Sequence, residues 1–172
     1  MPVVSRMTRD TGTRSSERAA GGAREARKAM AQEGGWRWCY RCEGVFIPGR
    51  RGNGVCPAGG AHDMSRSGYI TILYDVQGPN LQDRWRWCFR CYGLFFAGHQ
   101  TYGVCPTGGA HDPSRSANYS LDHGQAGAGQ QGGWRWCSKC EGLFYGGHQT
   151  TGVCPAGHGH NPGRTNYKLT VS

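Results

Sequence analysis

The sequence predicts a small all-β protein that is stabilised by metal. The first observation is a repeat: Trp-Arg-Trp-Cys-x-x-Cys begins at residues 36, 85 and 134, at intervals of 49 residues, and each copy continues to a third cysteine and a histidine. The second is composition, because 30 of the 172 residues are glycine and only 37% are hydrophobic. The third is that, after residue 34, aromatic residues are mixed with turn-forming Gly, Pro, Asn and Asp. This mixture is typical of short strands joined by tight turns.

The nine cysteines predict metal sites rather than a disulfide framework. They are divided three to a copy, so no copy can pair all its cysteines internally. Three thiolates and one imidazole, by contrast, complete the tetrahedral shell of a structural zinc ion. We therefore predict three structural Zn²⁺ ions. The predicted ligands are Cys39, Cys42, Cys56 and His62; Cys88, Cys91, Cys105 and His111; and Cys137, Cys140, Cys154 and His160.

The histidine of the third copy has an alternative. His158 lies four residues after Cys154 and could replace His160 as the fourth ligand. The positions in register with His158 are Gly60 and Gly109, which favours His160. His99 and His148 also share a Gly-His-Gln-Thr segment, but the first copy has an arginine in register. We interpret these two histidines as turn residues, with surface recognition as the alternative.

The predicted metal shell argues against catalysis. A Cys₃His shell leaves no open position, whereas catalytic zinc keeps one for water or substrate. The segment His62-Asp63-Met64-Ser65 has a counterpart at residues 111–114, but neighbours in sequence do not form a triad, whose members converge in space. The third copy lacks both the Asp and the Ser. We expect a protein that is not an enzyme and has no catalytic residues.

Each repeat is expected to follow the order strand, Cys knuckle, strand, second knuckle, strand, which is the order of a zinc ribbon. We expect the glycine two positions after the second cysteine to have a positive φ that turns backbone amides toward the sulfurs. The last strand of each repeat is predicted to centre on a tyrosine. The predicted strands surround residues 36–38, 85–87 and 134–136; 45–47, 94–96 and 143–145; and Tyr69, Tyr119 and Tyr167.

The chain divides into a basic arm at residues 1–34 and three zinc repeats at residues 35–75, 84–123 and 133–172. The arm has a net charge of +3 and no aromatic residue; it is expected to be disordered or partly helical, with a short helix from Ala23 to Glu33. The Gly- and Gln-rich segment 124–133 has the composition of a flexible linker. This favours three independent zinc-ribbon-like repeats, and the alternative is a closed pseudo-threefold body like a β-trefoil.

Aromatic and basic residues recur beside the cysteines and predict a binding surface. Single-stranded nucleic acids bind to surfaces that combine stacking rings with arginines, and exposed Trp also suits sugar rings or a protein partner. We expect a protein or glycan partner within a larger assembly, with nucleic acid as the alternative; core packing of the tryptophans is the simpler interpretation. The predicted partner-binding residues are Trp36, Arg37, Trp38, Trp85, Arg86, Trp87, Trp134, Arg135 and Trp136.

Charge and hydropathy limit the partner and the compartment. Nine thiolates and three divalent ions would lower the formal net charge from +9 to +6, which still favours acidic partners. No apolar run is long enough to span a membrane, and the N-terminal residues have no apolar signal-peptide core. We therefore expect a protein that is cytoplasmic or assembled into a complex, where a reducing environment keeps thiols free for metal.

The segment Trp-Arg-Trp-Cys-x-Lys/Arg-Cys-x-Gly-Leu-Phe, followed by Gly-Val-Cys-Pro-Ala-Gly-Gly-x-His, resembles a tandem Cys₃His zinc-ribbon-like repeat of poorly characterised bacterial, often actinobacterial, proteins. The resemblance covers most of residues 35–172 and implies an accessory module without catalytic activity. The second half differs from common zinc ribbons, because a C-x₅-H pair replaces their second Cys-x-x-Cys.

Overall fold

The computed structural model describes residues 31–49 and 51–172, and these form one compact unit. The described residues contain nine strands and no helix, which confirms the all-β prediction. No helix in the described ranges could therefore cross a membrane. The strands are β1 (Gln32–Trp38), β2 (Val45–Phe46), β3 (Ile70–Tyr74), β4 (Leu81–Trp87), β5 (Leu94–Phe96), β6 (Tyr119–His123), β7 (Gln130–Trp136), β8 (Leu143–Tyr145) and β9 (Tyr167–Val171).

Each repeat contributes one long strand, one short strand and one closing strand. In the first repeat, β1 pairs antiparallel with β2 near the cysteines and with β3 at its other end. The pairing between β1 and β3 shifts register between Glu33 and Trp36, and the same shift occurs in the other two repeats. Gly35 has a φ of 89° at this bulge, a value that glycine adopts without steric cost. The bulge bends the long strand and turns Trp36 into the core.

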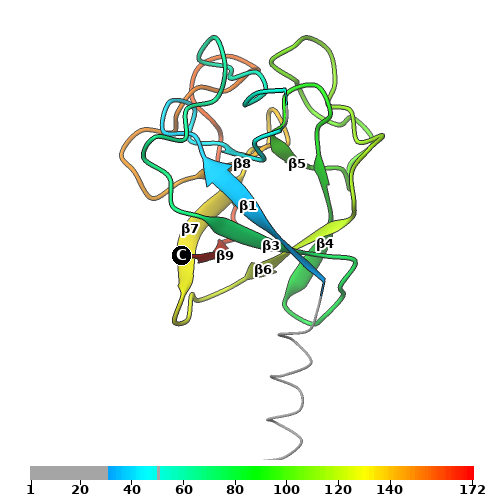
Figure 1. Ribbon diagram of the computed structural model, residues 1–172, viewed down its shortest axis with the longest axis vertical. Helices are drawn as coiled ribbons and strands as arrows, with labels where there is room; N and C mark the ends of the chain where they lie inside the picture. The colour runs from blue at the N-terminus through cyan, green and yellow to red at the C-terminus, as the bar shows by residue number, and fades with distance from the viewer. Residues whose placement is uncertain (1–30, 50) are drawn as a thin grey trace, which may run out of the picture. The chain divides into compact units, whose positions relative to one another are not determined.

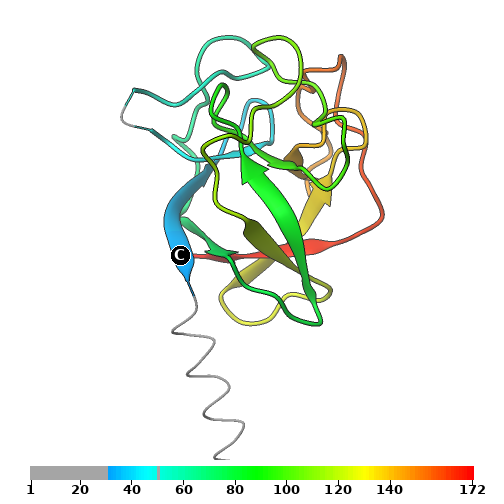
Figure 2. The same ribbon diagram turned by 90° about the vertical axis from the view of Figure 1, so that its right-hand side faces the viewer.

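The three closing strands pair with one another and join the repeats into one closed body. Strand β3 pairs with β6 and with β9, and β6 pairs with β9, all antiparallel. These pairings complete a ring at one end of the unit, while the cysteine loops gather at the other end (Figures 1 and 2). The repeats are therefore not independent units on a string. The structure matches the closed pseudo-threefold alternative, and zinc-ribbon-like repeats are its building blocks.

A single aromatic and aliphatic core fills the closed body. Trp36, Trp85 and Trp134 are each at most 1% exposed and pack with leucine, isoleucine and tyrosine side chains from all three repeats. A repeat of about 40 residues buries too little apolar surface to fold by itself. Sharing one core among three repeats removes much of that difficulty.

Three expectations about local structure require correction. Gln32 and Glu33 lie in β1 and not at the end of a helix; the rest of the expected helix and arm lies outside the described residues. The segment expected to be a linker ends in a turn in which Gln130 N–H donates to Gly127 O, and β7 starts at Gln130. The positive φ of 64° after the first knuckle belongs to Glu43 and not to Gly44.

The tyrosines of the closing strands are not all equivalent. Trp85 pairs with Tyr119 and Trp134 pairs with Tyr167, but Trp36 pairs with Ile70. The first repeat therefore has its tyrosine one position earlier, at Tyr69. Side chains alternate between the two faces of a strand, and Tyr69 is 57% exposed. The prediction that these strands centre on their tyrosines was wrong: Tyr119 and Tyr167 are the first residues of β6 and β9, and Tyr69 precedes β3.

Candidate metal centres

The structure brings the predicted ligands together in three buried clusters. In each cluster the three Sγ atoms and one histidine nitrogen lie within 4.8 Å of one another. All twelve side chains are at most 7% exposed, so each cluster is closed to solvent. The clusters are Cys39, Cys42, Cys56 and His62; Cys88, Cys91, Cys105 and His111; and Cys137, Cys140, Cys154 and His160. His158 is exposed and lies outside the third cluster.

The distances between ligand atoms suit a tetrahedral zinc ion. The Sγ atoms of the first and third cysteines lie 3.9, 3.9 and 3.8 Å apart in the three clusters. A tetrahedron with Zn–S bonds of about 2.3 Å has an edge of about 3.8 Å. A disulfide would instead require about 2.05 Å. The second cysteine lies 3.5 Å from the histidine Nδ1 in every cluster, close to the S–N edge of about 3.6 Å that the same geometry gives. Three structural zinc ions fit these sites.

Repulsion among the buried thiolates also favours a bound cation in each cluster. The neighbouring thiols of Cys39 and Cys56, together with burial, raise the pKa of Cys42 well above its ordinary value. Burial lowers the pKa of His111, but the adjacent Cys105 and Cys88 outweigh this effect and raise it to about 9. Without a metal, then, three buried thiolates repel one another and favour a proton. A divalent cation removes that cost, because thiolates are the form that binds metal.

Two backbone turns hold the cysteines of each repeat. In the first turn of repeat one, Cys39 N–H donates to Gly44 O at 2.9 Å and Glu43 N–H donates to Cys39 O at 2.8 Å. In the second, Cys56 N–H donates to Gly60 O at 2.8 Å. A Cβ on Gly44 would lie 3.3 Å from Cys42 Sγ. A side chain at this position would therefore crowd the sulfur, and the φ of Gly44 is not positive.

Backbone amides also support the sulfurs directly. Asp63 N–H donates to Cys39 Sγ at 3.3 Å, and the amides of Asp112 and Asn161 make the equivalent contacts at 3.4 Å. The carboxylate of Asp63 instead accepts from Ser65 N–H at 2.9 Å. Because the support comes from the main chain, the change from Asp to Asn in the third repeat leaves it intact.

Each ligand histidine is oriented by a ring stacked on it. The rings of Phe46 and His62 have centroids 4.6 Å apart at an interplanar angle of 18°, and the other two repeats have almost the same geometry. The phenylalanine is fully buried in every copy. This contact fixes the plane of the imidazole before metal binds. Sequence reasoning assigned these phenylalanines only to strands.

The second nitrogen of the ligand histidine connects neighbouring repeats. His111 Nε2–H donates to Cys140 O at 3.2 Å, and His160 Nε2–H donates to Cys42 O at 3.0 Å. These bonds leave Nδ1 free to face the metal. His62 Nε2 is buried without a partner in the described residues, and Cys91 O, the corresponding carbonyl, accepts Val55 N–H at 3.2 Å. The three ligand histidines surround a cavity of about 40 Å³ on the pseudo-threefold axis.

A second contact between neighbouring repeats requires glycine. Gly103 has a φ of 63°, and a Cβ there would lie 2.1 Å from Cys140 O. Gly54 and Gly152 make the corresponding approaches to Cys91 O and Cys42 O. The loop that leads to the third cysteine of one repeat therefore lies directly on the knuckle of the next. Metal binding in one repeat and the position of its neighbour are physically coupled.

His99 and His148 are half-exposed side chains that contact buried glutamates, and neither belongs to a metal cluster. His148 Nδ1 lies 3.0 Å from Glu43 Oε1, and Trp38 Nε1–H donates to Glu43 Oε2 at 2.8 Å. His99, Glu141 and Trp136 form the same arrangement. Both glutamates are at most 6% exposed. The histidine comes from one repeat and the glutamate and tryptophan from the next, so this network is a further bond between repeats.

The sequence lacks the residues for a third copy of this network. The fact that the histidine and the glutamate are missing together could have revealed the contact between them. The position equivalent to Glu43 and Glu141 is Tyr92, and the position equivalent to the two histidines is Arg50. The repeat interface that lacks the histidine therefore also lacks the glutamate. Trp87 Nε1 is correspondingly buried without a partner in the described part of the chain. Paired departures of this kind indicate contact.

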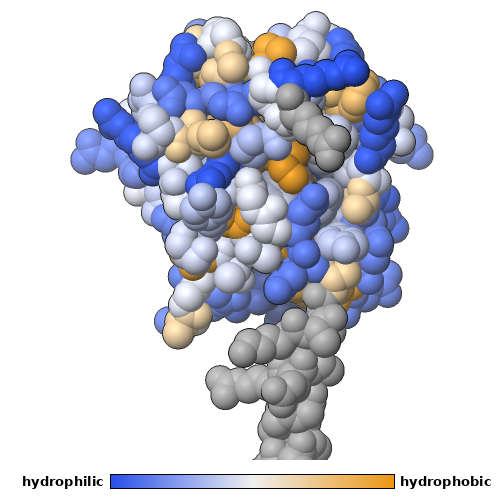
Figure 3. All heavy atoms as spheres, in the orientation of Figure 1, coloured by the Kyte–Doolittle hydropathy of each residue, from blue (hydrophilic) through white to orange (hydrophobic). Residues whose placement is uncertain are grey.

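The residues expected to bind a partner fall into two groups. Trp36, Trp85 and Trp134 lie in the core, so their burial corrects the expectation that they face a partner. Trp38, Trp87, Trp136 and the adjacent arginines are only partly buried. The face drawn in Figure 3 is largely hydrophilic, with apolar residues in separate small areas.

Several basic side chains have partners within the protein. Arg41 donates to the carbonyls of Ala58 and Gly59, and Lys139 donates to Gly157 O. These cations brace the second knuckle of their own repeat. Arg66 instead lies over the Tyr40 ring, 4.6 Å from its centroid, and Arg115 lies over Phe89 at 4.0 Å in the second repeat.

Comparisons with protein-family models, curated proteins and solved structures found no match to this chain.

Proposed function

We propose that this protein is a non-enzymatic binding or assembly module whose zinc ions serve only to hold its shape. The observation that supports this best is the burial of all twelve ligands, at most 7% exposed, around sites that four protein atoms complete. A substrate would have no coordination position to occupy. The described part of the chain is thus a metal-binding structural module. The existence and nature of a binding partner are what we propose.

The proposed partner is a protein or glycan that contacts the cation–aromatic pairs beside the first knuckles. Arg66 over Tyr40 and Arg115 over Phe89 present a flat aromatic surface with a positive charge, which is a common composition at interaction hot spots. The third repeat has Arg164 with Ser138 in place of the ring. Two of the three repeats would therefore bind the partner.

A single-stranded nucleic acid is the second candidate, favoured by the same pairs and by the formal charge of +9. Stacking on aromatic rings and contact with phosphates would both be available. Binding of this kind weakens steeply as salt increases. Protein or glycan binding would show a weaker salt dependence.

The experiment has two arms. Metal analysis of the purified full chain should give about three zinc ions, and a chelator should unfold it; a metal-free chain that stays folded contradicts the zinc role. Glycan arrays, co-purification and oligonucleotide titration at several salt concentrations then test the partner. The variant Arg66→Ala/Arg115→Ala should lose partner binding while keeping its zinc, and Arg164→Ala is the matched control because it lacks a ring beneath it. Equal loss in both variants would contradict the proposed surface.

A further inference from the structure

The interface between the first and second repeats lacks the His–Glu network and leaves His62 Nε2 without a partner in the described residues. In the apolar core, the interfaces between repeats differ at one further position. Where the second repeat meets the first, the Tyr119 ring packs edge-on against Trp36, with centroids 4.9 Å apart and an interplanar angle of 85°. Where the third repeat meets the second, Tyr167 packs on Trp85 in the same way, at 5.2 Å and 82°. Where the first repeat meets the third, the residue opposite Trp134 is Ile70.

The tyrosine hydroxyls at the first two interfaces have matching acceptors. Tyr119 O–H donates to Glu33, and Tyr167 O–H donates to Gln82. The residue in register in the third repeat is Gln131. Its side-chain amide makes no hydrogen bond in the described part of the chain, and Trp134 Nε1 beside it is buried without a partner there. Trp36 Nε1 also has no partner in the described residues, so the unpaired indole is not specific to the third interface. The free side-chain amide of Gln131 is specific to it.

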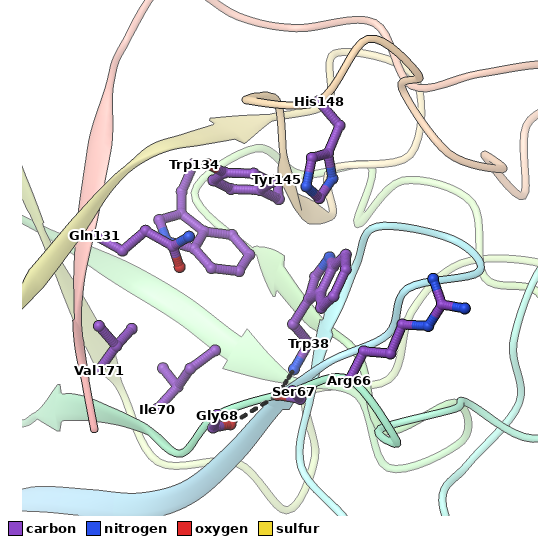
Figure 4. Close-up of a pocket in the computed structure, with 10 residues that line it drawn as sticks. All are labelled: Trp38, Arg66, Ser67, Gly68, Ile70, Gln131, Trp134, Tyr145, His148 and Val171. Atoms are coloured by element: carbon purple, nitrogen blue, oxygen red, sulfur yellow. Dashed lines mark hydrogen bonds between the residues drawn. The ribbon is translucent and has the colours of Figure 1, made fainter.

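A pocket of about 220 Å³ lies at this third interface. Trp134, Gln131 and Ile70 line its inner part, and Trp38, His148 and Arg66 lie around the same space (Figure 4). An apolar cavity of about 150 Å³ is large enough to bind benzene. The pocket therefore has room for one substituted six-membered ring.

We propose that this pocket binds a phenol, which takes the place that tyrosine side chains occupy at the other two interfaces. The ring would pack edge-on against Trp134, and its hydroxyl would donate to the Gln131 carbonyl oxygen. Residues 1–30 contain no aromatic residue, so that segment has no phenol to offer. The proposed phenol is either a free small molecule or a tyrosine side chain of another protein. The pocket shares Arg66 with the surface proposed above, but Trp134, Gln131 and Ile70 are not part of that surface, and no metal ligand lines the pocket.

Calorimetric titration of the zinc-loaded full chain with p-cresol, N-acetyl-tyrosinamide and toluene tests the proposal. We expect p-cresol to bind with one site per chain and toluene to bind about tenfold more weakly, because it makes no hydrogen bond to Gln131. Equal or tighter binding of N-acetyl-tyrosinamide would identify a protein tyrosine as the occupant, and binding of p-cresol alone would identify a free phenol. No binding of either phenol, or equal binding of toluene and p-cresol, overturns the proposal.

Variants locate the binding site. Ile70→Tyr restores the residue of the other repeats and should abolish p-cresol binding while retaining three zinc ions. Ile70→Phe fills the pocket without adding a hydroxyl and serves if the first variant does not fold. Tyr69→Phe is the matched control, because Tyr69 is adjacent in sequence but does not line the pocket; it should bind p-cresol unchanged. Binding that persists in a folded Ile70 variant places the ligand elsewhere and refutes the proposal.

Discussion

His160 donates a hydrogen bond from Nε2 to the carbonyl oxygen of Cys42, at 3.0 Å and across 118 residues of sequence. The donor is a ligand of the third cluster and the acceptor belongs to a ligand of the first. Together with the pairing of β3 and β9, this bond means that the last repeat closes on the first. The zinc sites are therefore parts of one structure.

Loss of a single zinc site should unfold the whole body. We expect Cys39→Ser to abolish the native fold of residues 31–172, because structural zinc contributes about 10–16 kcal/mol of apparent binding energy and a typical domain has only about 5–15 kcal/mol of stability. Circular dichroism and zinc content measure this. His158→Ala, at an exposed histidine outside the clusters, should keep all three ions. Two native repeats surviving in Cys39→Ser would mean that the repeats fold independently.

The contact between Glu43 and His148 should show measurable coupling between repeats. Glu43 accepts from Trp38 Nε1–H and contacts His148 Nδ1. Because the His148 side chain is half exposed, a double-mutant cycle with Glu43→Ala and His148→Ala should give a coupling of about 0.5–1.5 kcal/mol in unfolding free energy. Chemical denaturation of each variant supplies the values. A control cycle that combines Glu43→Ala with His123→Ala should give a coupling near zero. The His123 side chain makes no hydrogen bond in the described residues. Additive effects in the first cycle would contradict the network.

Two glycines that both have a positive φ should respond differently to alanine. Gly103→Ala should cost about 3 kcal/mol or more of stability, because its Cβ would meet Cys140 O at 2.1 Å in addition to the strain of a positive φ. Gly108 has a φ of 97° and nothing within 4 Å of its Cβ position, so Gly108→Ala should cost only about 1–2 kcal/mol. Thermal unfolding compares them. A similar loss in both would show that the contact between repeats is unimportant.

Stability should fall in alkaline solution because of Tyr119. Burial, the hydrogen bond to Glu33 and the charge of Glu33 raise the pKa of Tyr119 above its ordinary value of 10. A raised folded-state pKa stabilises the fold at pH values below the unfolded pKa, and the contribution is lost as the pH rises from about 10 toward the folded-state pKa. Absorbance of tyrosinate should show this residue ionising only with unfolding. In Tyr119→Phe the decline in unfolding free energy above pH 10 should be shallower; an unchanged slope would exclude Tyr119 as its source.

The sequence by itself determined the metal chemistry. The cysteines and the histidine of each repeat lie within 24 positions, and the turns between them are local, so their types and spacing predicted all three clusters and the short strands around them. The choice of His160 over His158 also followed from register alone. These features depend on neighbouring residues, which the sequence displays directly.

The tertiary structure decided how the repeats combine. Pairing of β3, β6 and β9 depends on closing a ring over more than 100 residues, and no local pattern distinguishes that closure from a row of separate repeats. Closure also buried Trp36, Trp85 and Trp134, which the sequence offered equally well as binding residues. The shift from Tyr69 to Ile70 is visible in the sequence, but only strand register shows that it turns a phenol outward and leaves a pocket beside Trp134.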